Sequence, residues 1–224
     1  MLLRLFLLIA LMASAAPAGA SEPLALSTRP VPLDHADWDR KTVGRLIYRG
    51  GLELDSEDER FGGLSGLALT GDRLTAVSDQ GHWIEARLSR DGNGRPSGLS
   101  DARIGHLTSL DGQPLVAKGL RDAEEILRLD DGSFLVSFER LHRVHRYSKD
   151  LDNPRPLNVP EEVSKARSNG GIEAMADLGG GLILLLCEDY PTDGTSSIGW
   201  VGREGEWRQI RYPHHETFKP TGAV

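Results

Sequence analysis

The 224-residue chain carries 33 acidic against 26 basic residues, a formal net charge of −7. This balance makes nucleic acid an unfavourable partner and a divalent cation a better one, because nucleic-acid binding depends on basic residues that neutralise phosphates. Cys187 is the single cysteine, so no intramolecular disulfide can form, and the fold must be stabilised by burial of apolar side chains.

The first twenty residues have the order of a secretory signal peptide. Arg4 precedes an apolar run over residues 5–16, and Ala18-Gly19-Ala20 supplies the small residues of a cleavage site. The run of about twelve residues is too short to cross roughly 30 Å of hydrocarbon. We therefore expect residues 1–20 to be removed and the mature protein to be exported, periplasmic or extracellular, with no membrane span. Loss of Arg4 leaves 25 basic and 33 acidic residues, a net charge of −8.

After a predicted linker over residues 21–42, residues 43–49 read as a single strand. Three similar segments follow, and each contains two short apolar runs around a Gly/Asp turn, which is typical of a β-hairpin. The equivalent residues Leu67, Ile126 and Met175 are 59 and 49 residues apart. The three predicted hairpins cover residues 64–79, 123–139 and 172–188.

Each hairpin is followed by two more apolar stretches that read as strands. Four antiparallel strands at a period of about 50 residues are typical of a β-propeller blade. The sequence therefore predicts an all-β, propeller-like domain over residues 43–224, in which 43–49 would be an outer strand that closes the ring. The additional predicted strands are residues 82–88 and 102–110, then 143–147 and 156–159, then 198–201 and 207–212.

The last residues, 220–224, resemble the start of a fourth unit, because Val224 lies 49 residues after Met175. A propeller closes with four to eight blades. Three blades and the start of another would form an incomplete ring, so we expect the sequence to be truncated within its fourth repeat.

Polar residues recur where each hairpin begins and ends. These two points are adjacent in an antiparallel pair, so the side chains should gather at one mouth of the central channel, where close carboxylates repel one another unless protons or a cation intervene. Ca²⁺ accepts six to eight oxygen ligands in flexible geometry. The alternative is that these acids are solvated residues beside turns. The pairs are Ser65 with Asp79, Glu124 with Glu139, and Glu173 with Glu188.

A basic run over residues 140–146 follows the second hairpin. Arg140 and His142 come next to Glu139, and could bind an anionic substrate group such as phosphate at the mouth. The alternative is a charged outer strand that resists edge-to-edge pairing.

Searches for other chemistry find little. The sequence contains no phosphate-binding glycine loop, no H-E-x-x-H motif and no cysteine metal cluster. Trp83, Trp200 and Trp207 lie in predicted strands, where packing between blades is the expected role.

Four segments resemble the phytase-like family of exported bacterial proteins described as having esterase-like activity of phytase. The resemblance implies a propeller-like domain whose recurring acids carry phosphoester hydrolysis, by analogy with calcium-dependent propeller phytases. The chain departs from that pattern at two residues. Ser65 lies where the later repeats have glutamate, and Gly222 lies where the fourth repeat could have supplied an acid. The segments are residues 61–67, 131–140, 169–174 and 218–221.

We therefore hypothesise an exported hydrolase that cleaves phosphate esters or related small-molecule esters with the help of Ca²⁺. Glu139 and Glu188 would be catalytic, and Arg140 and His142 would bind the substrate. Two alternatives stay open: a calcium-dependent lactonase-like propeller, for which Asn169 is available, and a non-catalytic binding propeller with a structural ion. The predicted metal ligands are Asp79, Glu124, Glu139, Glu173 and Glu188.

Overall fold

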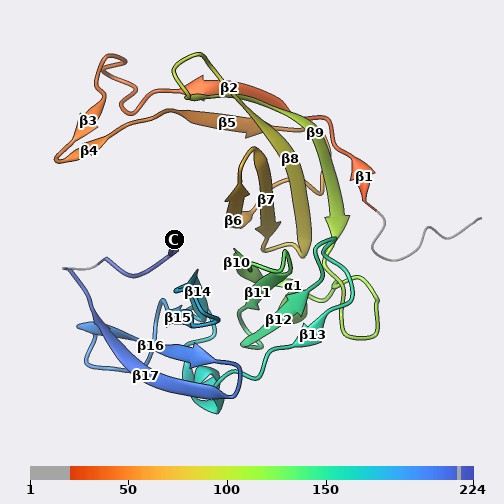
Figure 1. Cartoon of the computed structure of the whole chain (residues 1–224), viewed down its shortest axis with the longest axis vertical. Helices are drawn as coiled ribbons and strands as arrows, with labels where there is room; N and C mark the ends of the chain where they lie inside the picture. Colours follow the sequence, from red (N-terminus) through yellow and green to blue (C-terminus); the bar gives the residue numbers. More distant parts are fainter. Residues whose placement is uncertain (1–20, 216–217) are drawn as a thin grey trace, which may run out of the picture.

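The computed structural model describes residues 21–215 and 218–224 (Figure 1). The predicted signal peptide, residues 1–20, lies outside the described residues. Almost all regular structure in this part of the chain is β, as predicted, and its two helical segments are short: α1, Lys118–Arg121, and the 3-10 helix η1, Glu161–Lys165. No helix in the described part of the chain has the length and apolar character needed to cross a membrane.

The first sheet has the order β1-β9-β8-β7-β6, and all of its strands are antiparallel. The predicted hairpin over residues 64–79 is its β6–β7 pair. The sheet contains β6 (Leu64–Thr70), β7 (Arg73–Ser78), β8 (His82–Arg90), β9 (Pro96–His106) and β1 (Glu22–Pro23).

The second sheet has the order β10-β11-β12-β13. Its first two strands form the predicted hairpin over residues 123–139, with a turn at Asp130-Asp131-Gly132. The strands are β10 (Ala123–Arg128), β11 (Phe134–Phe138), β12 (Arg143–Tyr147) and β13 (Arg155–Pro156).

The third sheet repeats this order as β14-β15-β16-β17. The predicted hairpin over residues 172–188 is β14–β15, and the two predicted strands that follow it are also present. The strands are β14 (Ile172–Asp177), β15 (Ile183–Cys187), β16 (Ser196–Arg203) and β17 (Glu206–Pro213).

Successive sheets pack face to face through mixed apolar clusters. Val77 and Trp83 of the first sheet share one cluster with Phe138 of the second. Val144 of the second sheet shares another with Trp200 of the third. The expected packing role of the tryptophans is confirmed for Trp83 and Trp200, which are 5% and 2% exposed, and Trp207 packs against the second cluster.

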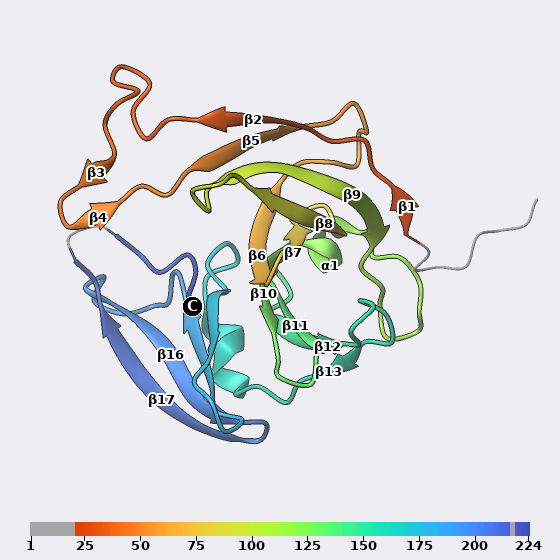
Figure 2. The same ribbon diagram turned by 45° about the horizontal axis from the view of Figure 1, so that its top comes forward.

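The first strands of the three sheets lie side by side in the order β6, β10, β14 (Figures 1 and 2). Gly66 allows the closest approach, since a Cβ there would lie 2.6 Å from the Ile126 backbone nitrogen. The Ser65 hydroxyl donates to the Ala123 carbonyl at 2.5 Å, and the buried Ser137 hydroxyl donates to the Ile172 carbonyl at 2.7 Å. These two serines join neighbouring sheets, and the described strands form no closed sheet.

The prediction of one strand over residues 43–49 is wrong. Two strands of two residues, β3 (Thr42–Val43) and β4 (Leu46–Ile47), pair around a turn in which Gly44 has a φ of +56°. The next strand, β5 (Gly51–Asp55), pairs with β2 (Ser27–Val31). The segment predicted as a linker, residues 21–42, contains the strands β1 and β2. The domain boundaries stay a prediction.

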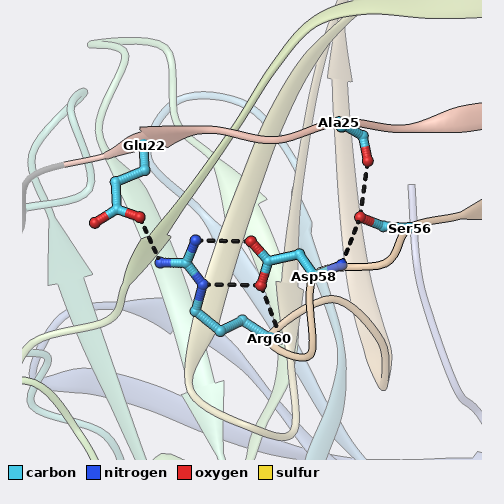
Figure 3. A network of polar contacts seen from close by, with 5 residues as sticks. All are labelled: Glu22, Ala25, Ser56, Asp58 and Arg60. Carbon is cyan, nitrogen blue, oxygen red and sulfur yellow. Dashed lines mark hydrogen bonds and ion pairs between the residues drawn. The ribbon is translucent and has the colours of Figure 1, made fainter.

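The N-terminal segment covers the outer face of the first sheet, where Leu24 packs against Ile84 and Ile104. Figure 3 shows the polar network that fastens it. The Arg60 guanidinium pairs with both carboxylate oxygens of Asp58, at 2.9 and 2.7 Å, and with Glu22 at 2.9 Å. The Ser56 hydroxyl donates to the Ala25 carbonyl at 2.7 Å.

Candidate functional site

Strands β6, β10 and β14, which begin the three predicted hairpins, each carry a β-bulge at the second residue. The pairing of β6, β10 and β14 with the next strand skips one residue in each case, namely Ser65, Glu124 and Glu173. A bulged residue has no cross-strand partner, and bulges commonly re-aim side chains beside active sites. The local backbone therefore presents the predicted residues Glu124 and Glu173 in the same way.

The end of each second strand returns to this point. The backbone N–H of the residue after β7, β11 or β15 donates to the carbonyl of the residue before β6, β10 or β14. The predicted adjacency of the two ends is thus present in all three hairpins. The bonds run from Asp79 to Gly63 at 3.0 Å, from Glu139 to Asp122 at 2.9 Å, and from Glu188 to Gly171 at 3.0 Å.

Three of these acids form a compact cluster. One carboxylate oxygen from each of Asp122, Glu124 and Glu139 lies within 4.8 Å of the other two. Asp122 is 5% exposed and Glu139 is 7% exposed. We refer to these three residues as the acidic cluster, and they offer the oxygen ligands that hard divalent cations prefer.

Burial and mutual repulsion raise the pKa values of the glutamates in the acidic cluster. The pKa of Glu124 rises to about 8, first because of burial and then because of the charges of Glu139, Glu173, Asp122 and Asp79. Burial also raises the pKa of Glu139, with Asp122 adding to the effect, while Arg140 and a hydrogen bond with Glu124 oppose it. Near neutral pH the acidic cluster therefore holds a proton unless a cation takes its place.

The other predicted ligands lie around this cluster. Burial raises the pKa of Glu173 to about 7, helped by the charges of Glu188 and Glu139 and opposed by Lys219. Glu173 and Glu188 are half-buried, and Asp79 is exposed. The charges of Glu139, Glu173 and Asp79 thus act on Glu124, and the charge of Glu188 acts on Glu139 and Glu173. Of the five predicted acids, only Glu124 and Glu139 belong to the acidic cluster itself.

Asp122 was missed by the sequence analysis. It precedes β10 at the position held by Gly63 and Gly171 in the other two hairpins. A Cβ at Gly63 would lie 1.9 Å from an Asp79 carboxylate oxygen, and one at Gly171 would lie 2.6 Å from His142 Nδ1. Because the other two hairpins have glycine at this position, the repeat gives no signal for an acid here.

Arg140 lies at the acidic cluster, with a φ of +60° and its backbone N–H bonded to the Ser168 carbonyl at 3.0 Å. Its Nε donates to the Asp122 carboxylate, and its side chain is 34% exposed. This ion pair raises the pKa of Arg140. The predicted substrate-binding arginine is therefore beside the acids and partly engaged by one of them.

His142 packs against Gly171 and near the Cβ of Glu139. Both of its ring nitrogens are buried, and neither has a hydrogen-bond partner among the described residues. The ring lies between the second and third sheets. Its predicted contact with a substrate anion stays a prediction.

The remaining arginines of this run have structural partners. The Arg143 guanidinium lies 4.0 Å from the centre of the Phe138 ring, and Arg146 Nε donates to the Ser133 hydroxyl at 2.8 Å. The alternative of a charged outer strand is wrong, because β12 lies between β11 and β13.

A family model described as "Phytase-like: Esterase-like activity of phytase" matches residues 59–224. This match includes the three sheets, apart from strand β1, and every residue of the acidic cluster. A comparison with curated proteins finds no match.

Solved structures are similar to the chain only at a low level. The computationally designed Ika8 protein is 13% identical over 71% of this chain and 39% of its own, with a TM-score of 0.37. The designed Ika4 protein is 12% identical over 71% of this chain and 77% of its own, with a TM-score of 0.36. The extracellular domain of the hybrid two-component system BT4673 from B. thetaiotaomicron is 15% identical over 76% of this chain and 24% of its own, with a TM-score of 0.43. The chain thus spans less than half of the first and third, and these likenesses carry no argument about function.

Proposed function

The chain belongs to the phytase-like family, and on this premise we propose that it hydrolyses phosphate esters or related small-molecule esters at the acidic cluster, with Ca²⁺ as its cation. The observation that carries the proposal is the convergence of Asp122, Glu124 and Glu139 within 4.8 Å in a buried setting. Buried carboxylates are unfavourable unless they are paired or bind a metal.

The donor set fits a hard divalent cation. Asp122, Glu124 and Glu139 would hold it, and the negative charges of Glu173, Asp79 and Glu188, which act on the glutamates of this cluster, would favour a cation there. The pKa of about 8 at Glu124 supports this assignment, because a cation would relieve the repulsion that keeps its proton bound. A bound Ca²⁺ would polarise a phosphoryl oxygen and offset the negative charge that develops there.

The remaining groups suit the other needs of ester hydrolysis. Water must lose a proton as its oxygen bonds to phosphorus, and the ester oxygen must gain one as its bond to phosphorus breaks. Glu188, which is half-buried and whose charge acts on Glu139 of the acidic cluster, would accept the proton from water. The guanidinium nitrogens of Arg140 that do not contact Asp122 can bind the phosphate, and His142 is a further candidate.

We also propose that the units β6–β9, β10–β13 and β14–β17 are successive blades of a β-propeller. Their common strand order, the contacts between β6, β10 and β14, and the apolar clusters between neighbouring sheets support this arrangement. The acidic cluster would then lie at one mouth of the channel along which the first strands run.

Export is part of the proposal, with residues 1–20 acting as a cleaved signal peptide. Expression of the full chain with fractionation and mass measurement tests it. We expect a mature protein that begins at Ser21 in the exported fraction, and a cytoplasmic protein that retains Met1 would contradict export.

The experiment for the activity is calcium titration of the mature chain. Melting temperature and turnover of p-nitrophenyl phosphate, bis(p-nitrophenyl) phosphate and an acyl ester are measured in parallel. We expect stabilisation by calcium together with phosphoester turnover. Glu139→Gln and Glu188→Gln should abolish turnover with the β-rich circular dichroism retained, while Glu53→Gln, at an exposed residue of β5, should leave turnover unchanged.

Each other outcome has a definite reading. Full turnover in both Glu139→Gln and Glu188→Gln would contradict the proposed site. Lactone opening without phosphatase activity would favour a lactonase-like enzyme. Calcium-dependent melting without turnover of any ester would indicate a binding protein with a structural ion.

A further inference from the structure

A cleft of about 280 Å³ lies between the N-terminal ribbon β2–β5, the loop that follows β2, and the turn between β8 and β9. It shares no residue with the acidic cluster. Most of its wall comes from residues 30–51, which precede the region matched by the family model. Its apolar lining includes Pro30, Pro32, Trp38, Tyr48 and Pro96.

Two glycines allow the segments around the cleft to come together. A Cβ at Gly51 would lie 2.8 Å from Tyr48 Oη and 2.9 Å from Val31 Cγ2. Gly50 has a φ of +116°, and a Cβ there would lie 3.1 Å from Pro96 Cδ. The Tyr48 hydroxyl donates to the Val31 carbonyl, so its ring is fixed in the wall. The cleft is thus built by specific close approaches of the backbone.

Trp38 provides an exposed aromatic surface at this cleft, with 62% of the residue accessible. Its loop is held in place by its own polar contacts, among them Lys41 Nζ to the Trp38 carbonyl at 2.5 Å and Arg40 to Asp34 at 2.9 Å. An exposed indole ring on a loop held in this way offers a stacking face for a flat ring.

The charged side chains that line the cleft differ in whether they already have hydrogen-bond partners. Lys41 donates to the Trp38 carbonyl, and Asp91 accepts from the backbone N–H groups of Asn93 and Arg95 at 2.8 and 2.9 Å. Among the described residues the Arg95 guanidinium forms no hydrogen bond or ion pair, although its charge helps to lower the pKa of Asp91 in the same lining. A guanidinium is well suited to bind a carboxylate or phosphate through two parallel hydrogen bonds.

We propose that this cleft binds a small organic anion that combines one flat ring face with one carboxylate or phosphate group. The ring stacks on Trp38 between the prolines, and the anionic group pairs with Arg95. The inference goes beyond the hydrolytic site, and it holds whether or not the acidic cluster is catalytic.

The experiment is calorimetric and fluorescence titration of the mature protein in the presence of a chelator. The probes are phenylphosphonate for an aryl anion and glucuronate for a sugar anion, with glucose and inorganic phosphate as probes that lack one of the two features. We expect one of the ring anions to bind with one-to-one stoichiometry and to change tryptophan emission. Whichever binds identifies the ring class.

The variants separate the cleft from the rest of the molecule. Trp38→Ala and Arg95→Gln should each weaken binding at least about tenfold, the loss expected for one good stacking contact or one charge-assisted pair. Arg208→Gln, at an exposed residue of β17 outside the lining, should leave binding unchanged, and so should Arg140→Gln at the acidic cluster. Circular dichroism checks that each variant folds.

Two results would overturn the proposal. One is binding that Trp38→Ala and Arg95→Gln both leave unaltered. The other is equal affinity for the ring anions, glucose and inorganic phosphate, including no measurable binding of any of them. A weakened affinity in Arg140→Gln alone would place the bound anion at the acidic cluster instead.

Discussion

The hairpins β6–β7 and β10–β11 share a bulge in the first strand and a backbone hydrogen bond that joins their two ends, yet their acids lie in different surroundings. In β10–β11, Asp122 and Glu139 are buried within a cluster of three carboxylates. In β6–β7, Asp79 is exposed, and Gly63 takes the position equivalent to Asp122. The same backbone therefore serves two chemical roles.

This comparison indicates that the bulge fixes where side chains point, and that the residue before the strand decides how many acids meet. Gly63 leaves room for the carboxylate of Asp79 to lie over the backbone. Asp122 instead adds a carboxylate and an ion pair with Arg140. Burial, together with the charge of Asp122, then raises the pKa values of Glu124 and Glu139.

The largest contrast between the two hairpins should appear in the serines that join them to the next sheet. Ser137→Ala should lower the free energy of unfolding by about 2–3 kcal/mol, because it leaves the buried Ile172 carbonyl and the Glu125 N–H without their partner. Ser65→Ala, at an exposed residue, should cost about 0.5–1 kcal/mol. Denaturant unfolding of both variants measures the difference, and equal losses would contradict it.

The change of the free energy of unfolding with pH should also distinguish the second hairpin from the first. Glu124 has a folded pKa of about 8 and Glu173 of about 7, against an ordinary value of 4.5. The native state thus binds more protons than the unfolded state between these values. The stability from these two groups is fully present below pH 4.5 and is lost as the pH rises toward 8. Without calcium the loss should be on the order of 2 kcal/mol after solvent screening.

Thermal melting in a chelator between pH 5 and pH 8 checks this expectation. Glu124→Gln should flatten the slope, whereas Asp79→Asn on the first hairpin should change it little. Added calcium should restore stability at pH 8. A stability that rises with pH over this range in the metal-free protein would contradict the assignment.

The affinity for calcium should depend more on the second hairpin than on the first. Asp122→Asn removes one of the three carboxylates and should weaken calcium binding about tenfold, because affinity follows the number of charged ligands. Asp79→Asn, the matched change on the first hairpin, should weaken it less than about threefold. Isothermal titration calorimetry gives both constants, and a loss that is equal in the two variants would place the cation away from the acidic cluster.

The hairpins could be predicted from the sequence because short apolar runs and Gly/Asp turns are local signals. The acids Glu124 and Glu139 could be predicted because they recur at matching positions. Asp122 could not, since its counterparts are glycines and its role depends on the close return of β11. The turn of His142 toward Gly171 likewise depends on how two sheets pack, which no local pattern encodes.

The smallest effect should come from Gly63→Ala, set against Gly71→Ala as its control. Both glycines have a positive φ, +58° and +63°, so each alanine should cost about 1 kcal/mol in backbone strain. Only at Gly63 would the new Cβ also meet a carboxylate, that of Asp79. Gly63→Ala should therefore displace Asp79 and alter calcium affinity by less than about threefold, while Gly71→Ala leaves it unchanged. Denaturant unfolding and calorimetry of both variants test this, and a large loss of affinity in Gly63→Ala would mean that the first hairpin contributes as much to the cation site as the second.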